Sequence, residues 1–87
     1  MVNMPNEPVS PTLVREVKAA YDRGLRKGWL REQAGYADAA TFSRICAGTQ
    51  SPGDTGKLLK LLAAMQTSAE TSAVILAEVA ASKGGAS

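Results

Sequence analysis

The sequence predicts an all-α protein, a small domain of four to five helices. Apolar residues recur at the three- and four-residue spacing of helices that bury one face. Residues that favour helix N-caps, Ser10 and Asp38 among them, precede two of these segments. Gly24, Gly35 and Gly48 follow three of them, and glycine ends helices because it readily adopts the left-handed backbone conformation. With 87 residues the chain builds one domain and a modest core, which favours association with a partner.

Residues 1–9 contain two prolines and no helical spacing, so we expect a flexible N-terminal arm. The first helix should begin at Pro11 with Ser10 as its N-cap, because proline lacks the backbone N–H that a first turn leaves unpaired. It is expected to end near Arg23. Its predicted buried stripe consists of Leu13, Val14, Val17 and Tyr21.

The second and third helices are expected over residues 26–34 and 39–47, with Asp38 as N-cap of the third. The second is too short to be stable alone in water, so it must pack against its neighbours. The short turn 35–38 forces the two helices to cross sharply. The predicted buried residues are Leu30, Ala34, Phe42 and Ile45, with Cys46 as a small buried side chain and Trp29 at the rim of the core.

The fourth helix, residues 55–66, has the clearest apolar stripe of the chain. The pattern T-x-x-E at Thr67 and Glu70 is typical of a helix N-terminus and predicts a fifth helix over residues 68–83. One continuous helix is the alternative. Residues 84–87 are expected to form a flexible tail. The stripe of the fourth helix contains Leu58, Leu61, Leu62 and Met65.

The fifth segment has almost no polar face, because small and branched apolar residues fill most of its positions. A helix that is apolar nearly all round must be covered on more than one side. In so small a protein the expected cover is a second copy of the chain, in a symmetric homodimer. The alternative is that the alanines tolerate exposure to water. The predicted interface residues are Ser72, Ile75, Leu76 and Val79.

Composition excludes several classes of protein. No apolar run is long enough to span a bilayer, and the N-terminal residues lack the order of a signal peptide, so we expect a cytoplasmic protein. Histidine is absent, which removes the usual general base and the commonest zinc ligand. The one cysteine cannot form an intramolecular disulfide. We therefore expect no enzyme, no metal site and no cofactor.

Positive charge is concentrated in one segment. The net charge of the chain is only +2, but residues 13–31 hold six lysines and arginines against two acidic residues, which gives +4. Such a segment is typical of a basic patch that binds a polyanion. A solvated helix face is the alternative.

Two short helices joined by a tight turn, with one helix before and another after, allow one of the pair to project. A projecting helix fits the major groove of DNA, which is about 12 Å wide and accepts one α-helix. The pattern therefore favours a helix-turn-helix in which residues 26–34 form the supporting helix and residues 39–47 form the helix that is presented to DNA.

Three segments resemble the helix-turn-helix transcription regulators of the lambda-repressor type, which include Cro. GLRKGWLREQAGY, residues 24–36, is similar to that family's GLSQEELAELAGV, and TFSRICAG, residues 41–48, is similar to its TISRIENG. Pro52 followed by KLLKLLAAM, residues 57–65, is similar to the next helix of the family. At Arg31 the family usually has alanine, so we expect the stem of Arg31 to bend aside along the surface.

The resemblance implies a sequence-specific double-stranded DNA-binding regulator, such as a small phage or plasmid repressor, that acts as a dimer. Residues 10–66 would form the DNA-binding domain and residues 67–83 the oligomerisation helix. Arg44 is the leading candidate, because a guanidinium binds both acceptors of a guanine edge or clamps a phosphate. The candidate DNA-binding residues are Arg26, Lys27, Asp38, Ala39, Ala40, Ser43, Arg44, Ala47, Thr49 and Gln50.

Two other interpretations stay open. The helices can serve as the scaffold of a protein-binding module, an antitoxin or an adaptor with a regulatory protein as partner, since fold does not settle function. The second open interpretation is an oligomeric helix-turn-helix activator. Two of the candidate assignments also have simpler alternatives. The alanines of residues 39–47 can be present for their helix propensity alone, and Arg26 can be a solvated charge that contacts no DNA.

Overall fold

The computed structural model describes residues 8–85, so most of the predicted arm and the last two residues of the predicted tail lie outside the described residues. The described chain is all-helical, as predicted, and residues 8–85 contain no strand. None of their helices is long and apolar enough to cross a bilayer. The helices are α1 (Pro11–Asp22), α2 (Lys27–Ala34), α3 (Ala39–Ala47), α4 (Thr55–Ala64) and α5 (Ala69–Gly85).

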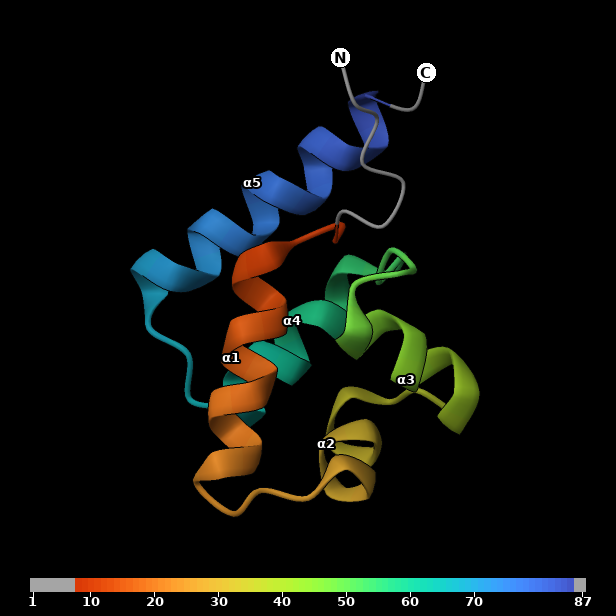
Figure 1. Ribbon diagram of the computed structural model, residues 1–87, viewed down its shortest axis with the longest axis vertical. Coiled ribbons are helices and arrows are strands. Elements are labelled where there is room, and N and C mark those ends of the chain that lie inside the picture. The colour runs from red at the N-terminus through yellow and green to blue at the C-terminus, as the bar shows by residue number, and fades with distance from the viewer. Residues whose placement is uncertain (1–7, 86–87) are drawn as a thin grey trace.

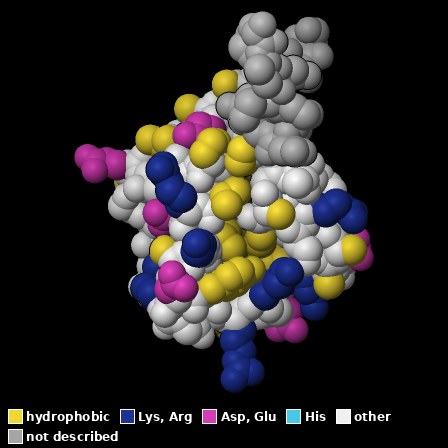
Figure 2. All heavy atoms as spheres, viewed as in Figure 1, with side chains coloured by type: hydrophobic (Ala, Val, Ile, Leu, Met, Phe, Trp, Pro, Cys, Tyr) yellow, Lys and Arg dark blue, Asp and Glu magenta, His cyan; other side chains and the backbone are white. Residues whose placement is uncertain are grey.

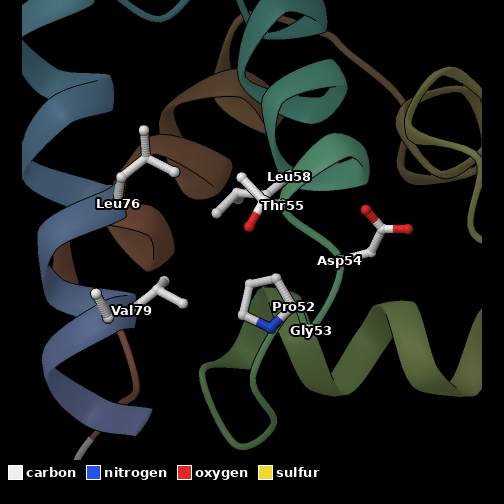
Figure 3. A pocket seen from close by; sticks show the side chains of 8 residues that line it. Pro52, Gly53, Asp54, Thr55, Leu58, Leu76 and Val79 are labelled. Carbon is white, nitrogen blue, oxygen red and sulfur yellow. The ribbon is translucent and has the colours of Figure 1, made fainter. Parts of the chain in front are cut away.

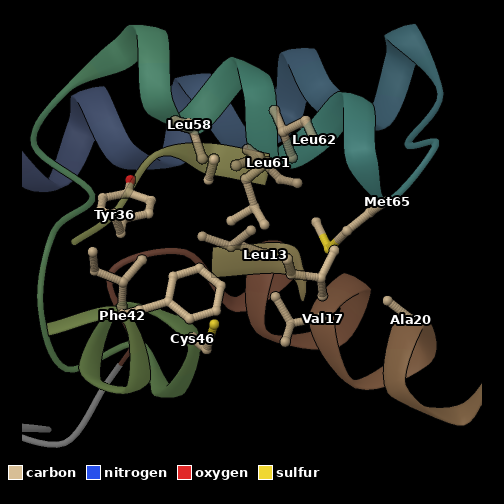
Figure 4. Close-up of a cluster of buried hydrophobic side chains, with 14 of the residues drawn as sticks. Leu13, Val17, Ala20, Tyr36, Phe42, Cys46, Leu58, Leu61, Leu62 and Met65 are labelled. Carbon is tan, nitrogen blue, oxygen red and sulfur yellow. The ribbon is translucent and has the colours of Figure 1, made fainter. Parts of the chain in front are cut away.

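The helices surround one core, and α1 lies between two partners (Figure 1). Helix α5 packs against α1 on one side and α3 packs against it on the other, while α2 packs against α4. The short helix α2 thus gains the tertiary contacts that its length requires. The core contains residues of every helix, and Tyr36 and Phe42 meet in it with ring centroids 5.5 Å apart (Figure 4).

Most of the predicted core residues are buried, but Val14 is only half-buried and Tyr21 is a correction, while Trp29 was predicted at the rim. Tyr21 is 36 % exposed, because the core stripe of α1 runs through Leu13, Val17 and Ala20 and leaves Tyr21 at its edge, toward α3. Trp29 is 43 % exposed on α2. Both rings therefore lie at the surface of the described molecule.

Helices α4 and α5 are separate, and the break lies at Gln66. Gln66 has a φ of 58°, a left-handed conformation that a non-glycine residue rarely adopts. The Thr67 N–H then reaches back to the carbonyl of Leu62 at 3.0 Å, which closes the end of α4 two residues earlier than the pattern predicts. The cap of α5 is Ser68, whose hydroxyl accepts from the Thr71 N–H at 3.1 Å, so the predicted capping pattern at Thr67 is wrong by one residue.

Helix α5 extends through Gly84 and Gly85, which the sequence predicted as tail. Its Glu78 reaches the first turn of α1. One Glu78 oxygen accepts from the Ser10 hydroxyl at 2.7 Å, and the other accepts from the Thr12 hydroxyl at 2.8 Å. Ser10 also accepts from the Leu13 N–H at 3.1 Å, as predicted for the N-cap of α1.

Candidate nucleic-acid interface

The outer face of α3 consists of small residues around one arginine. Phe42 and Ile45 point inward and are fully buried, as predicted. On the other side Ala39, Ala40, Arg44 and Ala47 are exposed and Ser43 is half-buried. Because the neighbours of Arg44 are small, its side chain is the one long group on this face of the described helix.

Both ends of α3 are fixed by local hydrogen bonds. At the first turn the carboxylate of Asp38 accepts from the backbone N–H and from the hydroxyl of Thr41, and these bonds hold the pKa of Asp38 below its ordinary value. At the last turn Gly48 has a φ of 85°, and its carbonyl accepts from the Val9 N–H at 2.9 Å. Pro8 and Val9 thus lie against the end of α3, although residues 8 and 9 were predicted as part of the flexible arm.

Arg44 is held between two polar neighbours. Its Nε donates to Gln50 at 2.9 Å and its second terminal nitrogen donates to the Thr41 hydroxyl at 3.4 Å. The Thr49 hydroxyl donates to the Arg44 carbonyl at 3.2 Å, so Thr49 closes the helix end beneath the guanidinium. These contacts place the predicted residues Arg44, Thr49 and Gln50 together at the end of α3.

The start of α2 presents the predicted residues Arg26 and Lys27, and both are exposed. Arg26 occupies the N-cap position without a side-chain hydrogen bond to the first turn. The first N–H groups of a helix have no partner within it, and at α2 two exposed positive side chains accompany them. Such an end favours a phosphate.

Arg31 joins α2 to the turn that leads into α3. Its side chain turns toward the carbonyls of residues 36 and 37. One guanidinium nitrogen then donates to the carbonyls of Tyr36 and Ala37, at 2.9 and 3.2 Å. The turn therefore has two restraints, this contact and the left-handed Gly35, whose φ is 88°.

Three arginines of the basic segment 13–31 bind groups of the chain itself. Arg15 donates to Thr12, and Arg23 donates to the Met65 carbonyl at the end of α4, at 2.7 Å. Arg31 binds the turn. The basic side chains of this segment that remain near α3 are Lys18 and Lys27, which line a furrow between α1 and α3.

Cys46 is buried on the inner side of α3, as predicted. Burial raises the pKa of its thiol, although Tyr21 and Lys27 act in the opposite direction. A thiol that is protonated at neutral pH reacts slowly, which agrees with a packing residue.

The predicted dimer interface needs a correction. Ile75 is fully buried and Val79 is 9 % exposed in the core of the single chain, because α5 turns this side toward α1. Leu76 and Val79 line a hollow of about 100 Å³ against the loop at Pro52 and Gly53 (Figure 3). Ser72 and Leu76 are half-buried. The exposed side of α5 carries Ala73, Val74, Ala77, Ala80 and Ala81 instead.

Sequence reasoning missed Thr41, which bridges Asp38 and Arg44 on the surface of α3. Its hydroxyl donates to the carboxylate of Asp38 and accepts from Arg44. The spacing of three residues between each pair was visible in the sequence, because such pairs are neighbours on one helix side.

In comparisons with known proteins, no family model matches the chain, and no curated protein and no solved structure matches it either.

Proposed function

We propose that the protein is a sequence-specific double-stranded DNA-binding transcription regulator that presents α3 to the major groove, as a small repressor does. The observation that carries the proposal is the outer face of α3, where four exposed residues include three alanines and one arginine. A face without other long side chains permits close approach to base edges. The proposal makes Arg44 the residue that reads a base, preferably guanine.

Contacts to the phosphate backbone would come from both sides of α3. Arg26 and Lys27 lie at the start of α2, and a helix N-terminus favours an anion. On the other side Gln50 and Thr49 follow α3 directly. Phosphate contacts of this kind fix the register of a protein on DNA, and base contacts give the sequence preference.

Asp38 has a different part in this proposal. It is exposed and negatively charged, which disfavours direct contact with phosphates. Its carboxylate is occupied by the two hydrogen bonds from Thr41. We assign Asp38 a positioning task, to hold the first turn of α3.

Selection of bound oligonucleotides from a random pool tests the proposal. The expected result is an enriched site whose affinity falls steeply with salt, because phosphate contacts release counterions. Arg44→Ala is expected to lower the preference for the enriched site by about 1–3 kcal/mol. The matched control, Lys60→Ala on α4, removes the same charge from another exposed position and should leave the preference unchanged.

Two results would contradict the proposal. One is a pool without enrichment at low salt. The other is an enriched site for which Arg44→Ala and Lys60→Ala bind equally well, since Arg44 would then read no base.

The proposal includes a second copy of the chain, so that two α3 helices reach half-sites about 34 Å apart. We place the contact between the two copies on the exposed side of α5. Val74 is 47 % exposed there, between Ala73 and Ala77. A helix with small residues lets another helix approach closely, and one larger apolar side chain adds burial.

Sedimentation of two charge variants tests the dimer. Val74→Glu is expected to give monomers, because it places a charge in the contact. Leu59→Glu on α4, where the native side chain is 48 % exposed, is the matched control and should leave the mass unchanged. Unaltered mass of the Val74 variant, or a monomeric native protein at micromolar concentration, would remove the dimer from the proposal. Ile75→Asp is not a suitable variant, because it is expected to unfold the chain.

A further inference from the structure

A furrow with an apolar floor and a basic rim lies between α1 and α3. Its volume is about 310 Å³, and it is lined by Val14, Val17, Lys18, Tyr21, Lys27, Ser43, Cys46 and Ala47. Figure 2 looks onto this side, where hydrophobic side chains gather along the middle of the molecule and Lys and Arg side chains, with Asp and Glu side chains among them, stand on both sides. The reading of DNA by Arg44 makes no use of this floor.

The floor exposes apolar surface that the described residues leave uncovered. Tyr21 is 36 % exposed and belongs to the few large hydrophobic side chains at the surface of the described residues. Val14 beside it is half-buried, and Ala47 on the opposite helix is exposed. Contiguous apolar surface with a polar rim is typical of an interaction site.

The rim carries charge of one sign. Lys18 on α1 and Lys27 at the start of α2 are both exposed, and none of the lining residues is acidic. An occupant must therefore present carboxylates beside its apolar groups, because complementary charge selects partners at such a rim.

The shape of the furrow selects the size of the occupant. Lys18, Tyr21, Lys27 and Ala47 are exposed, so the furrow is open to solvent and not enclosed. A small molecule normally buries most of its surface in a closed pocket, which this furrow does not offer. An open apolar groove between two helices fits a third helix instead.

We propose that this furrow docks an acidic amphipathic helix of a regulatory protein. Apolar side chains of that helix lie on the floor, and its carboxylates pair with Lys18 and Lys27. Lys27, Ser43 and Ala47 also belong to the proposed DNA surface. The docked helix therefore excludes DNA, a consequence that rests on the proposed function, whereas the docking itself does not.

The probe is a synthetic peptide of about 14 residues, near the minimum length for a helix in water. It carries leucines at helical spacing and glutamates at the flanking positions; a matched peptide has lysine in place of each glutamate. NMR of the full chain follows the methyl groups. We expect saturable shifts at Val14, Val17 and Ala47 with the acidic peptide and at least about tenfold weaker binding of the basic one.

Two protein variants test the rim. The double variant Lys18→Glu and Lys27→Glu is expected to weaken binding of the acidic peptide about tenfold. Lys60→Glu on α4 is the control, and the methyl groups of Leu59 and Val74, exposed on α4 and α5, report contacts outside the furrow. Equal binding of both peptides, equal shifts at Val74 and Val14, or no saturable shift would overturn the docking.

Other occupants give their own results, and each of them overturns the proposal. Shifts of the furrow methyl groups on dilution, without peptide, would show a second copy of the chain there. Shifts caused by Val2→Ser together with Met4→Ser would show the preceding segment of the same chain.

Measuring DNA affinity with and without the peptide distinguishes a failure of the docking proposal from a failure of the proposed function. The acidic peptide is expected to lower the affinity for the enriched DNA site, and docking without such loss overturns the exclusion of DNA. A protein that docks the peptide and binds no DNA contradicts the proposed function and leaves the docking standing.

Discussion

Glu78 and Thr12, which lie 66 positions apart in the sequence, are joined by two hydrogen bonds. The Thr12 hydroxyl donates to one carboxylate oxygen at 2.8 Å, and the Thr12 N–H donates to the other at 3.2 Å. A negative group at this place also interacts favourably with the N-terminal end of the helix dipole. The contact makes α5 a second cap of α1, beside the local cap by Ser10.

The first prediction concerns acid stability. Burial alone would raise the pKa of Glu78, but hydrogen bonds from Ser10 and Thr12, aided by the charge of Arg15, leave the pKa below its ordinary value. The Glu78 carboxyl therefore binds a proton less tightly in the native state than in the unfolded state. The stabilisation is fully present above the ordinary glutamate value, about 4.3, and is lost as the pH falls from there through the native pKa.

Glu78→Gln is expected to lower the free energy of unfolding at neutral pH by about 1 kcal/mol, as the loss of a helix cap does. As the pH falls through the native pKa of Glu78, the difference from the native protein should shrink, because the native carboxyl then becomes protonated. Urea denaturation at pH 7 and pH 3 measures both values. Glu32→Gln on α2 is the charge control, and an equal loss in both variants at pH 7 would show that the cap contributes nothing.

The second prediction is a stabilising change at Gln66. Its φ of 58° favours glycine, so Gln66→Gly is expected to raise the free energy of unfolding by about 0.5 kcal/mol, after the greater freedom of unfolded glycine is subtracted. Gln33→Gly within α2 should instead lower it by about 1 kcal/mol. Thermal unfolding of the two variants compares them directly. A loss of stability in both would mean that the left-handed turn imposes no strain.

The third prediction separates backbone strain from crowding at two glycines. Gly35 and Gly48 have nearly the same φ, 88° and 85°. A Cβ at Gly35 would meet nothing within 4 Å, whereas a Cβ at Gly48 would lie 2.7 Å from the Pro8 Cβ and 3.0 Å from a Val14 methyl. Gly35→Ala is expected to cost about 1 kcal/mol and Gly48→Ala about 3 kcal/mol.

Denaturant midpoints of the two alanine variants give the comparison. Equal costs would mean that the segment at Pro8 does not press on the end of α3. The difference between the two variants is the informative quantity, because the strain is common to both.

The fourth prediction concerns the turn between α2 and α3. Arg31→Ala removes two contacts to carbonyls and is expected to lower the free energy of unfolding by about 1 kcal/mol. Arg31→Lys should restore only part of it, because an ammonium lacks the planar fork of a guanidinium. Amide exchange in the turn should rise in both variants. Unchanged exchange at Ala37 would show that the turn is held by Gly35 alone.

Much of the fold could be predicted from the sequence because its signals are local. The spacing of Leu58, Leu61 and Leu62 identifies a buried helix side, and Asp38 and Gly48 fix the bounds of α3. The break at Gln66 was harder to predict, since the residue itself favours helix and only the backbone of the folded chain makes it left-handed.

The candidate site was predicted in part for the same reason. Which residues of α3 face outward follows from helical spacing, and Arg44 and Ala47 are exposed as expected. The partner of Arg23 could not be predicted, because it depends on how α1 meets the end of α4, whereas the partners of Arg15 and Arg31 are local. The side of α5 that faces α1 depends on tertiary packing too, and Ile75 was therefore assigned to the wrong surface.

Helix α5 contributes Ile75 and Val79 to the core and Glu78 to the first turn of α1. An unrelated helix in place of α5 would therefore lack these core contacts and the cap of α1. A recombination event that joined residues 10–66 to a foreign tail would have to supply a new apolar cover and a new acceptor for α1 at the same time. Residues 10–66 and α5 thus depend on each other for a complete core and for the cap of α1.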